Sequence, residues 1–446
     1  MNKNLNIPTY QEILRFTMPV VLILVATGLM TLIDTMFIGQ LGTPQLAAVP
    51  LAGLVYSFGT ILLFGIIYNS TAFIARAYGA KKYHKIGTIL ANYQFLALLG
   101  LPLLILFIQI WPLFSVIASL NATVDNLAWI YLQIRVWDTP FSLSLALYSF
   151  FYLSLGNSRF PMLVYFGVLV MNVVLDYGLI FGNLGMPALG VAGSAYASVL
   201  AQAFGALFII TVSLLGSTRT RFALRIFKWP DFALLKQIIQ VGLPLGIGNF
   251  IIFSAWLGFT LIIGHLGETP LASSNIGIQI RQSLGALCFA LGIAAGSYMG
   301  RFLGANCPAI ARQITNRILV LGIIYMSGLG GILWFFGGYI AQFFTTDTAV
   351  IYQAELMFKV MALYQIFDGI QLILRSALGG AGDTLIPTSF VAICTIVIMF
   401  PLTILLSQLI TPGIVGAYLA AFFYLLVLAS LMFYRYQKGK WATISL

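Results

Sequence analysis

The fold is decided by apolar runs such as residues 20–33, which read Val-Val-Leu-Ile-Leu-Val-Ala-Thr-Gly-Leu-Met-Thr-Leu-Ile and end at Asp34. With its flanks, this run has the about 20 predominantly apolar residues that a membrane-spanning helix needs. Such runs recur along all 446 residues, of which 61% are hydrophobic and only 7% charged. Soluble domains carry roughly 25% charged residues. The composition therefore excludes a soluble protein and predicts an all-α polytopic membrane protein.

About twelve spanning helices are expected, because long apolar segments follow one another with only short polar breaks. The segments fall at 13–38, 46–77, 88–112, 128–153, 161–182, 189–215, 240–264, 271–303, 315–344, 354–379, 387–409 and 413–434.

The loops between these segments alternate in charge. Basic residues such as Lys81 and Arg159 lie in every second loop, whereas the loop at 40–44 has neither Lys nor Arg. Because cytoplasmic loops are enriched in Lys and Arg, this alternation predicts that both termini lie in the cytoplasm. We expect an integral protein of the plasma (bacterial inner) membrane. Arg135 and Lys359 are exceptions. The net charge of +11 thus reflects orientation in the lipid bilayer and gives no reason to expect a nucleic-acid partner.

The two halves of the chain repeat. Aligning Ile38 with Ile263 lays Ile38-Gly-Gln-Leu-Gly42 on Ile263-Gly-His-Leu-Gly267, and Arg76 on Arg301, without a gap. Nearer the end of each half, Gly190 and Gly193 align with two further glycines, Gly413 and Gly416. Two copies of six helices in the same order form parallel repeats, related by an axis along the membrane normal.

The repeat predicts two pseudo-symmetric six-helix lobes, at residues 1–216 and 240–446, joined by a cytoplasmic linker at 217–239. Repeat-built transporters bind their cargo between the repeats and alternate its access by rocking them. Small residues are expected at close helix contacts. Glycines recur every four residues in the eighth segment, a pattern that indicates packing: Gly292, Gly296, Gly300 and Gly304.

Two acids interrupt apolar runs of the first half. Asp34 lies in the first span, and Asp176 follows Asn172 by four residues, so both of these side chains share one helix face. An acid in a span costs about 3 kcal/mol to insert and indicates function by default. The alternative is an acid that only locks helices together. The second half replaces these polar groups with apolar residues, namely Phe259, Ile398 and Leu402, so the shared architecture does not require them.

The two carboxylates are expected to bind a cation. In a poorly hydrated cavity they cannot both ionise cheaply, so one would hold a proton. The same oxygens, with Asn172 and a nearby hydroxyl, could instead hold Na⁺, and the sequence leaves both alternatives open. Asp368 is the other acid in an apolar run that we single out. Either it pairs with Arg375 on the same helix, or it faces a cavity of the second half.

Nothing in the sequence predicts an enzyme. There is no phosphate-binding glycine loop, no HExxH pattern and no paired catalytic motif. Three cysteines and two histidines stand apart, so neither a disulfide framework nor a metal site is expected. No cofactor is expected, and transport would draw on an ion gradient.

Several motifs together resemble multidrug and toxic compound extrusion (MATE) transporters of the MOP superfamily. One is Asp34-Thr-Met-Phe-Ile-Gly-Gln-Leu-Gly42. The others are Asn172 with Asp176, the glycine-rich stretch 181–198, and Gln365-Ile-Phe-Asp-Gly-Ile-Gln371. The resemblance covers essentially the whole chain. It leaves the branch open between the DinF-like and NorM-like members.

The resemblance implies two lobes that enclose a V-shaped cavity, and export of small organic, often cationic, compounds by antiport with H⁺ or Na⁺. The family's cation-coupling site would consist of Asp34, Asn172, Asp176 and Ser198, with Tyr131 nearby, and Asp368 would be a secondary cavity acid. Ser198 stands where a Thr is common, and Ser149 stands where some members have an Asn.

Trp256 and Phe259 on the seventh segment are weak candidates for substrate contacts. A monomer is expected. Two alternative functions remain: a flippase for lipid-linked oligosaccharides or lipids from the same superfamily, and an ion channel.

Overall fold

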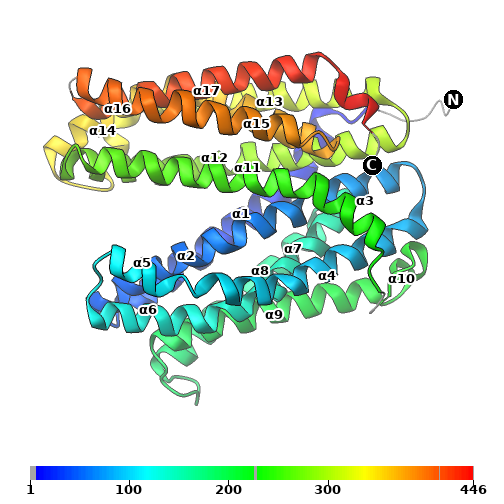
Figure 1. Cartoon of the computed structure of the whole chain (residues 1–446), viewed down its shortest axis with the longest axis horizontal. Coiled ribbons are helices and arrows are strands. Elements are labelled where there is room, and N and C mark those ends of the chain that lie inside the picture. Colours follow the sequence, from blue (N-terminus) through cyan, green and yellow to red (C-terminus); the bar gives the residue numbers. More distant parts are fainter. Residues whose placement is uncertain (1–6, 226–228, 411, 445–446) are drawn as a thin grey trace. The chain divides into compact units, whose positions relative to one another are not determined.

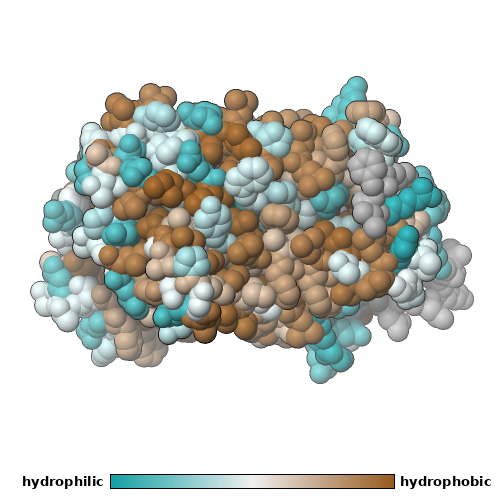
Figure 2. All heavy atoms as spheres, turned by 90° about the horizontal axis from the view of Figure 1, so that it is seen from below, coloured by the Kyte–Doolittle hydropathy of each residue, from teal (hydrophilic) through white to brown (hydrophobic). Residues whose placement is uncertain are grey.

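The computed structural model of the chain describes residues 7–225, 229–410 and 412–444. All regular structure within these residues is helical (Figure 1), as the composition predicts. Eleven helical segments there are long and apolar enough to cross a membrane. Figure 2 shows apolar side chains over much of one face of the molecule, as lipid-facing helices require.

The first half contains helices that correspond to the first six predicted segments. They are α1 (Tyr10–Gly39), α2 (Thr43–Tyr68), α3 (Ser70–Gly79), α4 (Tyr83–Ile108), the short α5 (Trp111–Ile117), α6 (Ala122–Arg135), the 3₁₀ turn η1 (Val136–Asp138), α7 (Thr139–Ser154), α8 (Arg159–Phe181) and α9 (Val191–Leu214). The short α10 (Ser217–Phe222) follows.

The second half begins with α11, inside the segment predicted as the linker. Its helices are α11 (Phe232–Gly264), α12 (Glu268–Gly304), α13 (Pro308–Gln342), α14 (Thr348–Gly380), α15 (Leu385–Cys394), the π-helical turn η2 (Thr395–Met399), α16 (Phe400–Leu409), α17 (Gly413–Gln437) and the final 3₁₀ turn η3 (Lys440–Thr443).

By their packing contacts the residues form two compact units. The first-half unit is Pro19–Gly246, in which α2 packs on α6, α8 on α9, and α7 on both α4 and α9. The second-half unit combines Met1–Met18 with Ile247–Leu446, and α14 packs in it on α12, α13 and α17. The two units divide at Met18/Pro19 inside α1 and at Gly246/Ile247 inside α11. The lobe boundaries at 216 and 240, proposed from the sequence, stay a prediction.

The fourth predicted span, 128–153, is a broken helix. Residues 136–138 form a 3₁₀ turn, and Pro140 follows in the first turn of α7. Proline has no N–H and its ring clashes with the preceding turn, so a continuous helix is disfavoured here. The Thr139 hydroxyl donates instead to the Val136 carbonyl at 2.8 Å. The corresponding helix of the second half, α14, is continuous over 33 residues.

The repeated glycines mark close helix crossings. A Cβ atom on Gly193 would collide with the Leu179 carbonyl of α8, and one on Gly416 with the Leu406 carbonyl of α16. The final two spans of each half therefore cross at backbone contact. The ridge on α12 behaves in the same way, because Gly296 meets the backbone position of Gly380 on α14. This agrees with the packing role predicted for that ridge.

Candidate cation site

The polar residues predicted to bind a cation come together in the first-half unit. Asp34, near the end of α1, lies within hydrogen-bonding range of both Asp176 and Asn172 of α8. Asn172 and Asp176 have no exposed surface, and Asp34 is half-buried. Their spacing of four residues places the amide and the carboxylate on one face of α8, facing Asp34.

At this short range none of these groups forms a well-aligned hydrogen bond. One Asp34 oxygen, both Asp176 carboxylate oxygens and the Asn172 side-chain amide are buried without a partner among the described residues. Bare carboxylates cannot donate to each other, because both are acceptors only. Most buried polar groups in proteins are satisfied, so orphaned ones require an explanation such as a missing ion. A proton or a Na⁺ ion would satisfy these acceptors.

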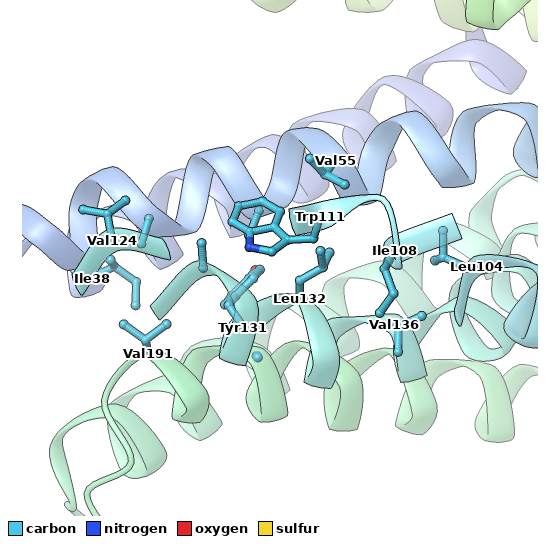
Figure 3. Packing of buried hydrophobic residues seen from close by; sticks show 14 of the residues in the cluster. Ile38, Val55, Leu104, Ile108, Trp111, Val124, Tyr131, Leu132, Val136 and Val191 are labelled. Atoms are coloured by element: carbon cyan, nitrogen blue, oxygen red, sulfur yellow. The ribbon is translucent and has the colours of Figure 1, made fainter. Parts of the chain in front are cut away.

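Tyr131 of α6 closes one side of this cluster. It is 6% exposed, and its hydroxyl lies within electrostatic range of Asp34 and Asp176. Its ring packs with Trp111 and Leu132 in a buried hydrophobic cluster (Figure 3). These apolar neighbours lower the polarity around Tyr131, and charges interact more strongly in a less polar surrounding.

Ser198 lies on α9, fully buried, and its hydroxyl has no partner among the described residues. Ser194, one turn earlier, is also fully buried, and its hydroxyl has no partner among the described residues. No sequence pattern indicated a role for Ser194. Because no hydrogen bond joins Ser198 to Asp34 or Asp176 within the described part of the chain, its membership of the site stays a prediction. Ser149 uses its hydroxyl within α7, donating to the Leu145 carbonyl at 2.6 Å.

An ion pair beside the cluster was missed by sequence reasoning. Asp138, 2% exposed, lies 3.7 Å from Arg135, and the Tyr56 hydroxyl donates to the same carboxylate oxygen at 2.8 Å. The Arg135 guanidinium also lies 5.3 Å from the centre of the Tyr56 ring. It is close enough to act electrostatically on Asp34 and Asp176. The sequence contained a signal for this ion pair. Arg135 breaks the charge alternation of the loops, and an acid, Asp138, follows it by three residues.

The second-half unit has a different polar cluster. Asp368 of α14 pairs with Arg281 of α12 at 3.5 Å, so its ionic partner comes from another helix. The Arg281 guanidinium lies 4.2 Å from the Trp256 ring centre. Phe259 has no exposed surface and packs edge-on against Trp256 and Tyr418. In this conformation Phe259 offers no surface to a substrate.

No three His, Cys, Asp or Glu side chains converge as metal ligands among the residues that the structure describes. Candidate ligands of a monovalent cation are thus the oxygens of Asp34, Asp176 and Asn172, with Ser198 as a predicted addition. Carboxylate, amide and hydroxyl oxygens suit hard cations.

Repeated membrane helices with buried, unsatisfied carboxylates in the first-half unit are typical of a secondary transporter. Comparisons with known proteins narrow this class. The family model MatE matches residues 19–178 and again 244–405, and the two matches begin at Pro19 and Pro244, which the repeat aligns with each other. The chain therefore belongs to the MATE family of ion-coupled antiporters, and it is a transporter and not an enzyme. The sequence repeat is confirmed by the same two matches.

Curated relatives agree over nearly the whole chain. A probable multidrug resistance protein NorM of Thermotoga maritima is 26% identical over 433 residues, which is 97% of this chain and 93% of that protein. The multidrug resistance protein PmpM of Pseudomonas aeruginosa is 27% identical over 380 residues, 84% of this chain and 79% of that protein.

Among solved structures, the bent form of the Vibrio cholerae MATE transporter VcmN superposes with a TM-score of 0.87 at 18% identity. The match covers 96% of each chain. It confirms the fold predicted from the sequence, an all-helical polytopic membrane protein.

Proposed function

We propose that this chain exports small organic compounds, often cationic, by antiport with H⁺ or Na⁺ through alternating access. The observation that carries the proposal is the set of orphaned acceptor atoms around Asp34 and Asp176 in a buried part of the first-half unit. The names of the relatives, multidrug resistance proteins, support the substrate class. The V-shaped cavity between the lobes, the monomeric state and cytoplasmic termini remain part of this proposal.

Coupling requires that the cation and the exported compound disfavour each other's binding, because a ligand shifts a two-state equilibrium only through its differential affinity. A cation that enters the cluster neutralises Asp34 and Asp176 and satisfies their oxygens. The cation-bound lobe then packs differently from the empty one. The inward ion gradient supplies the free energy for export, and the difference between the two states couples the ion to the exported compound.

The test is ethidium efflux from proteoliposomes under separately imposed Na⁺ and H⁺ gradients, comparing the unmodified chain with Asp34→Asn. We expect one gradient to drive efflux in the unmodified chain and neither to do so in Asp34→Asn. Glu355→Gln serves as the matched control, because Glu355 is half exposed and its ion pair is with Lys359 one turn away, at 2.8 Å. Unchanged efflux by Asp34→Asn would contradict the proposal.

The alternative functions give other results in the same vesicles. An ion channel would pass ions without saturation and without a fixed ratio to ethidium. A flippase would move a fluorescent lipid-linked oligosaccharide or lipid between leaflets and would leave ethidium in place.

A further inference from the structure

A second cluster of intramembrane polar groups is built around Arg281, in the first half of helix α12, which starts at Glu268. Its guanidinium stacks on Trp256 of α11 and reaches Asp368 of α14 through Nη1 at 3.5 Å. Gln371 donates from Nε2 to the other Asp368 oxygen at 2.9 Å. Charged groups in spans are rare and mark functional sites by default.

The orphaned atoms of this cluster are chiefly donors. Arg281 Nε, the Tyr364 hydroxyl and Gln365 Nε2 are buried without hydrogen-bond partners among the described residues, and the Gln371 amide oxygen is the one acceptor that accompanies them. Tyr364 is within electrostatic range of Arg281, and it lies on the same face of α14 as Asp368, four residues away. The cation cluster in the first half has the opposite character, with orphaned acceptors.

The ion pair leaves much of the guanidinium unused. Asp368 occupies only Nη1, at a long 3.5 Å, while Arg281 Nε has no partner among the described residues. Arginine has five N–H donors in a planar fork that matches a carboxylate in two-point contact. The Arg281 side chain is 23% exposed, whereas its Nε atom and the Tyr364 hydroxyl are buried, so a ligand meets the exposed part of the guanidinium first.

The repeat shows that this cluster is an addition to the shared architecture. The alignment that lays Ile38 on Ile263 also lays Tyr56 on Arg281. The alignment that lays Gly156 on Gly382 lays Ser142 on Asp368. The first-half unit folds without this pair, just as the second-half unit folds without the acids of the cation site. Each half therefore carries its own specific polar group.

From these observations we infer that the Arg281 cluster binds the carboxylate of an amphipathic organic acid that the protein transports. In the ligand-bound state the carboxylate accepts from Arg281 Nε and from the Tyr364 hydroxyl, both buried in this conformation, and the apolar body of the ligand lies beside Trp256. This inference rests on the proposed function and names a substrate class for it: compounds with an acidic group, in addition to organic cations.

The test compares fluorescein, an organic carboxylate, with ethidium, a cation without an acidic group. Binding of fluorescein to the detergent-purified full-length protein is followed by fluorescence anisotropy, and efflux of both dyes is followed in proteoliposomes. We expect Arg281→Gln to weaken fluorescein binding and efflux at least about tenfold, because it removes a charge-assisted contact. Ethidium efflux should change less than about twofold, since no positive charge is needed to bind it.

Three controls keep the result interpretable. Arg281→Gln leaves Asp368 without its cation, so the double variant Arg281→Gln/Asp368→Asn removes both charges and must show the same loss of fluorescein binding. Arg281→Lys retains the charge but not the fork, and an intermediate affinity is expected. Arg312→Gln changes an exposed arginine that bonds Gln437 in the same unit, and it should have no effect.

Unaltered fluorescein binding in both Arg281→Gln variants would overturn the inference. So would displacement of fluorescein by phosphatidylglycerol added to the detergent solution, because a lipid phosphate would then be the occupant. If ethidium efflux fails in the unmodified protein, the proposed export function fails, whatever the result with fluorescein.

Discussion

At the scale of single residues, Asp138 shows how a charge is kept inside a membrane lobe. Its carboxylate has a cation, Arg135, and a phenol donor, Tyr56, both on one oxygen. Removing one partner of a buried ion pair leaves the other charge uncompensated, which typically costs about 3–5 kcal/mol. Replacing both partners with apolar residues of similar volume is often neutral or stabilising.

We therefore expect Asp138→Asn to lower the free energy of unfolding by up to about 3–5 kcal/mol, because Arg135, 16% exposed, loses its counter-charge. The double variant Arg135→Met/Asp138→Leu should recover most of this loss. Thermal unfolding in detergent, followed by size-exclusion chromatography of the heated protein, measures both. An equally low melting temperature in the single and double variants would show that the ion pair is not the cause.

The sequence predicted part of this residue-level picture. Asp34, Asn172 and Asp176 were found because each is costly in an apolar run and lacks a counterpart in the other half. The pairing of Asp368 with Arg281 was not found, because an ion pair between α12 and α14 joins residues 87 positions apart and leaves no periodic signal. Asp138 and Arg135 did leave a local signal, the spacing of three residues.

At the scale of helices, glycine decides how closely α12 and α14 approach. A Cβ atom on Gly380 would collide with the backbone of Gly296, whereas one on the adjacent Gly379 would meet nothing within 4 Å. Both glycines are buried at the end of α14, so a substitution at Gly379 is a matched control for the same substitution at Gly380. The collision involves backbone atoms, which cannot rotate out of the way as a side chain can.

We expect Gly380→Ala to reduce stability by about 1–3 kcal/mol, because the inserted methyl group overpacks the crossing. Gly379→Ala should be neutral or stabilising by up to about 1 kcal/mol, since alanine favours a helix over glycine. Melting temperatures and membrane expression of the two variants provide the measurement. A Gly379→Ala protein that is less stable than Gly380→Ala would contradict this packing argument.

Helix positions were predicted well and helix breaks poorly. All twelve apolar segments coincide with helical runs of the structure, because hydropathy reports directly on burial in lipid. The breaks at Asn69 and at 136–138 were not predicted. Hydropathy averages over about 19 residues and does not register a change of one turn. Of these two breaks, only the one at 136–138 has a marker in the sequence, because Pro140 disfavours a continuous helix there.

At the scale of the whole molecule, the basic loops define an orientation. Lys81 and Lys82 lie between α3 and α4, and Arg159 begins α8, whereas the turns after α1 and α11 contain Gln40 and His265. In the proposed orientation the first group faces the cytoplasm and the second the outside.

A membrane-impermeant maleimide should therefore label a cysteine placed at Gln40 or His265 in intact cells. It should label one at Lys82 or Ser158 only after the membrane is permeabilised. Labelling is measured in a background in which the three native cysteines are replaced, two of which are buried. The reverse labelling pattern would contradict the proposed orientation.

The broken span α6–η1–α7 also bears on how the chain enters the bilayer during synthesis. Neither of its parts is long enough to be a span alone, and it contains Arg135, which costs about 2.5–3.5 kcal/mol at the centre of an inserting helix. By itself, this segment is therefore expected to insert inefficiently into the membrane. Its insertion is helped by Tyr56 of α2, a helix made earlier, which donates to Asp138 in the folded unit. Partition of this segment into lipid thus depends on the first-half unit as a whole, in which an earlier helix, α2, supports the insertion of a later one.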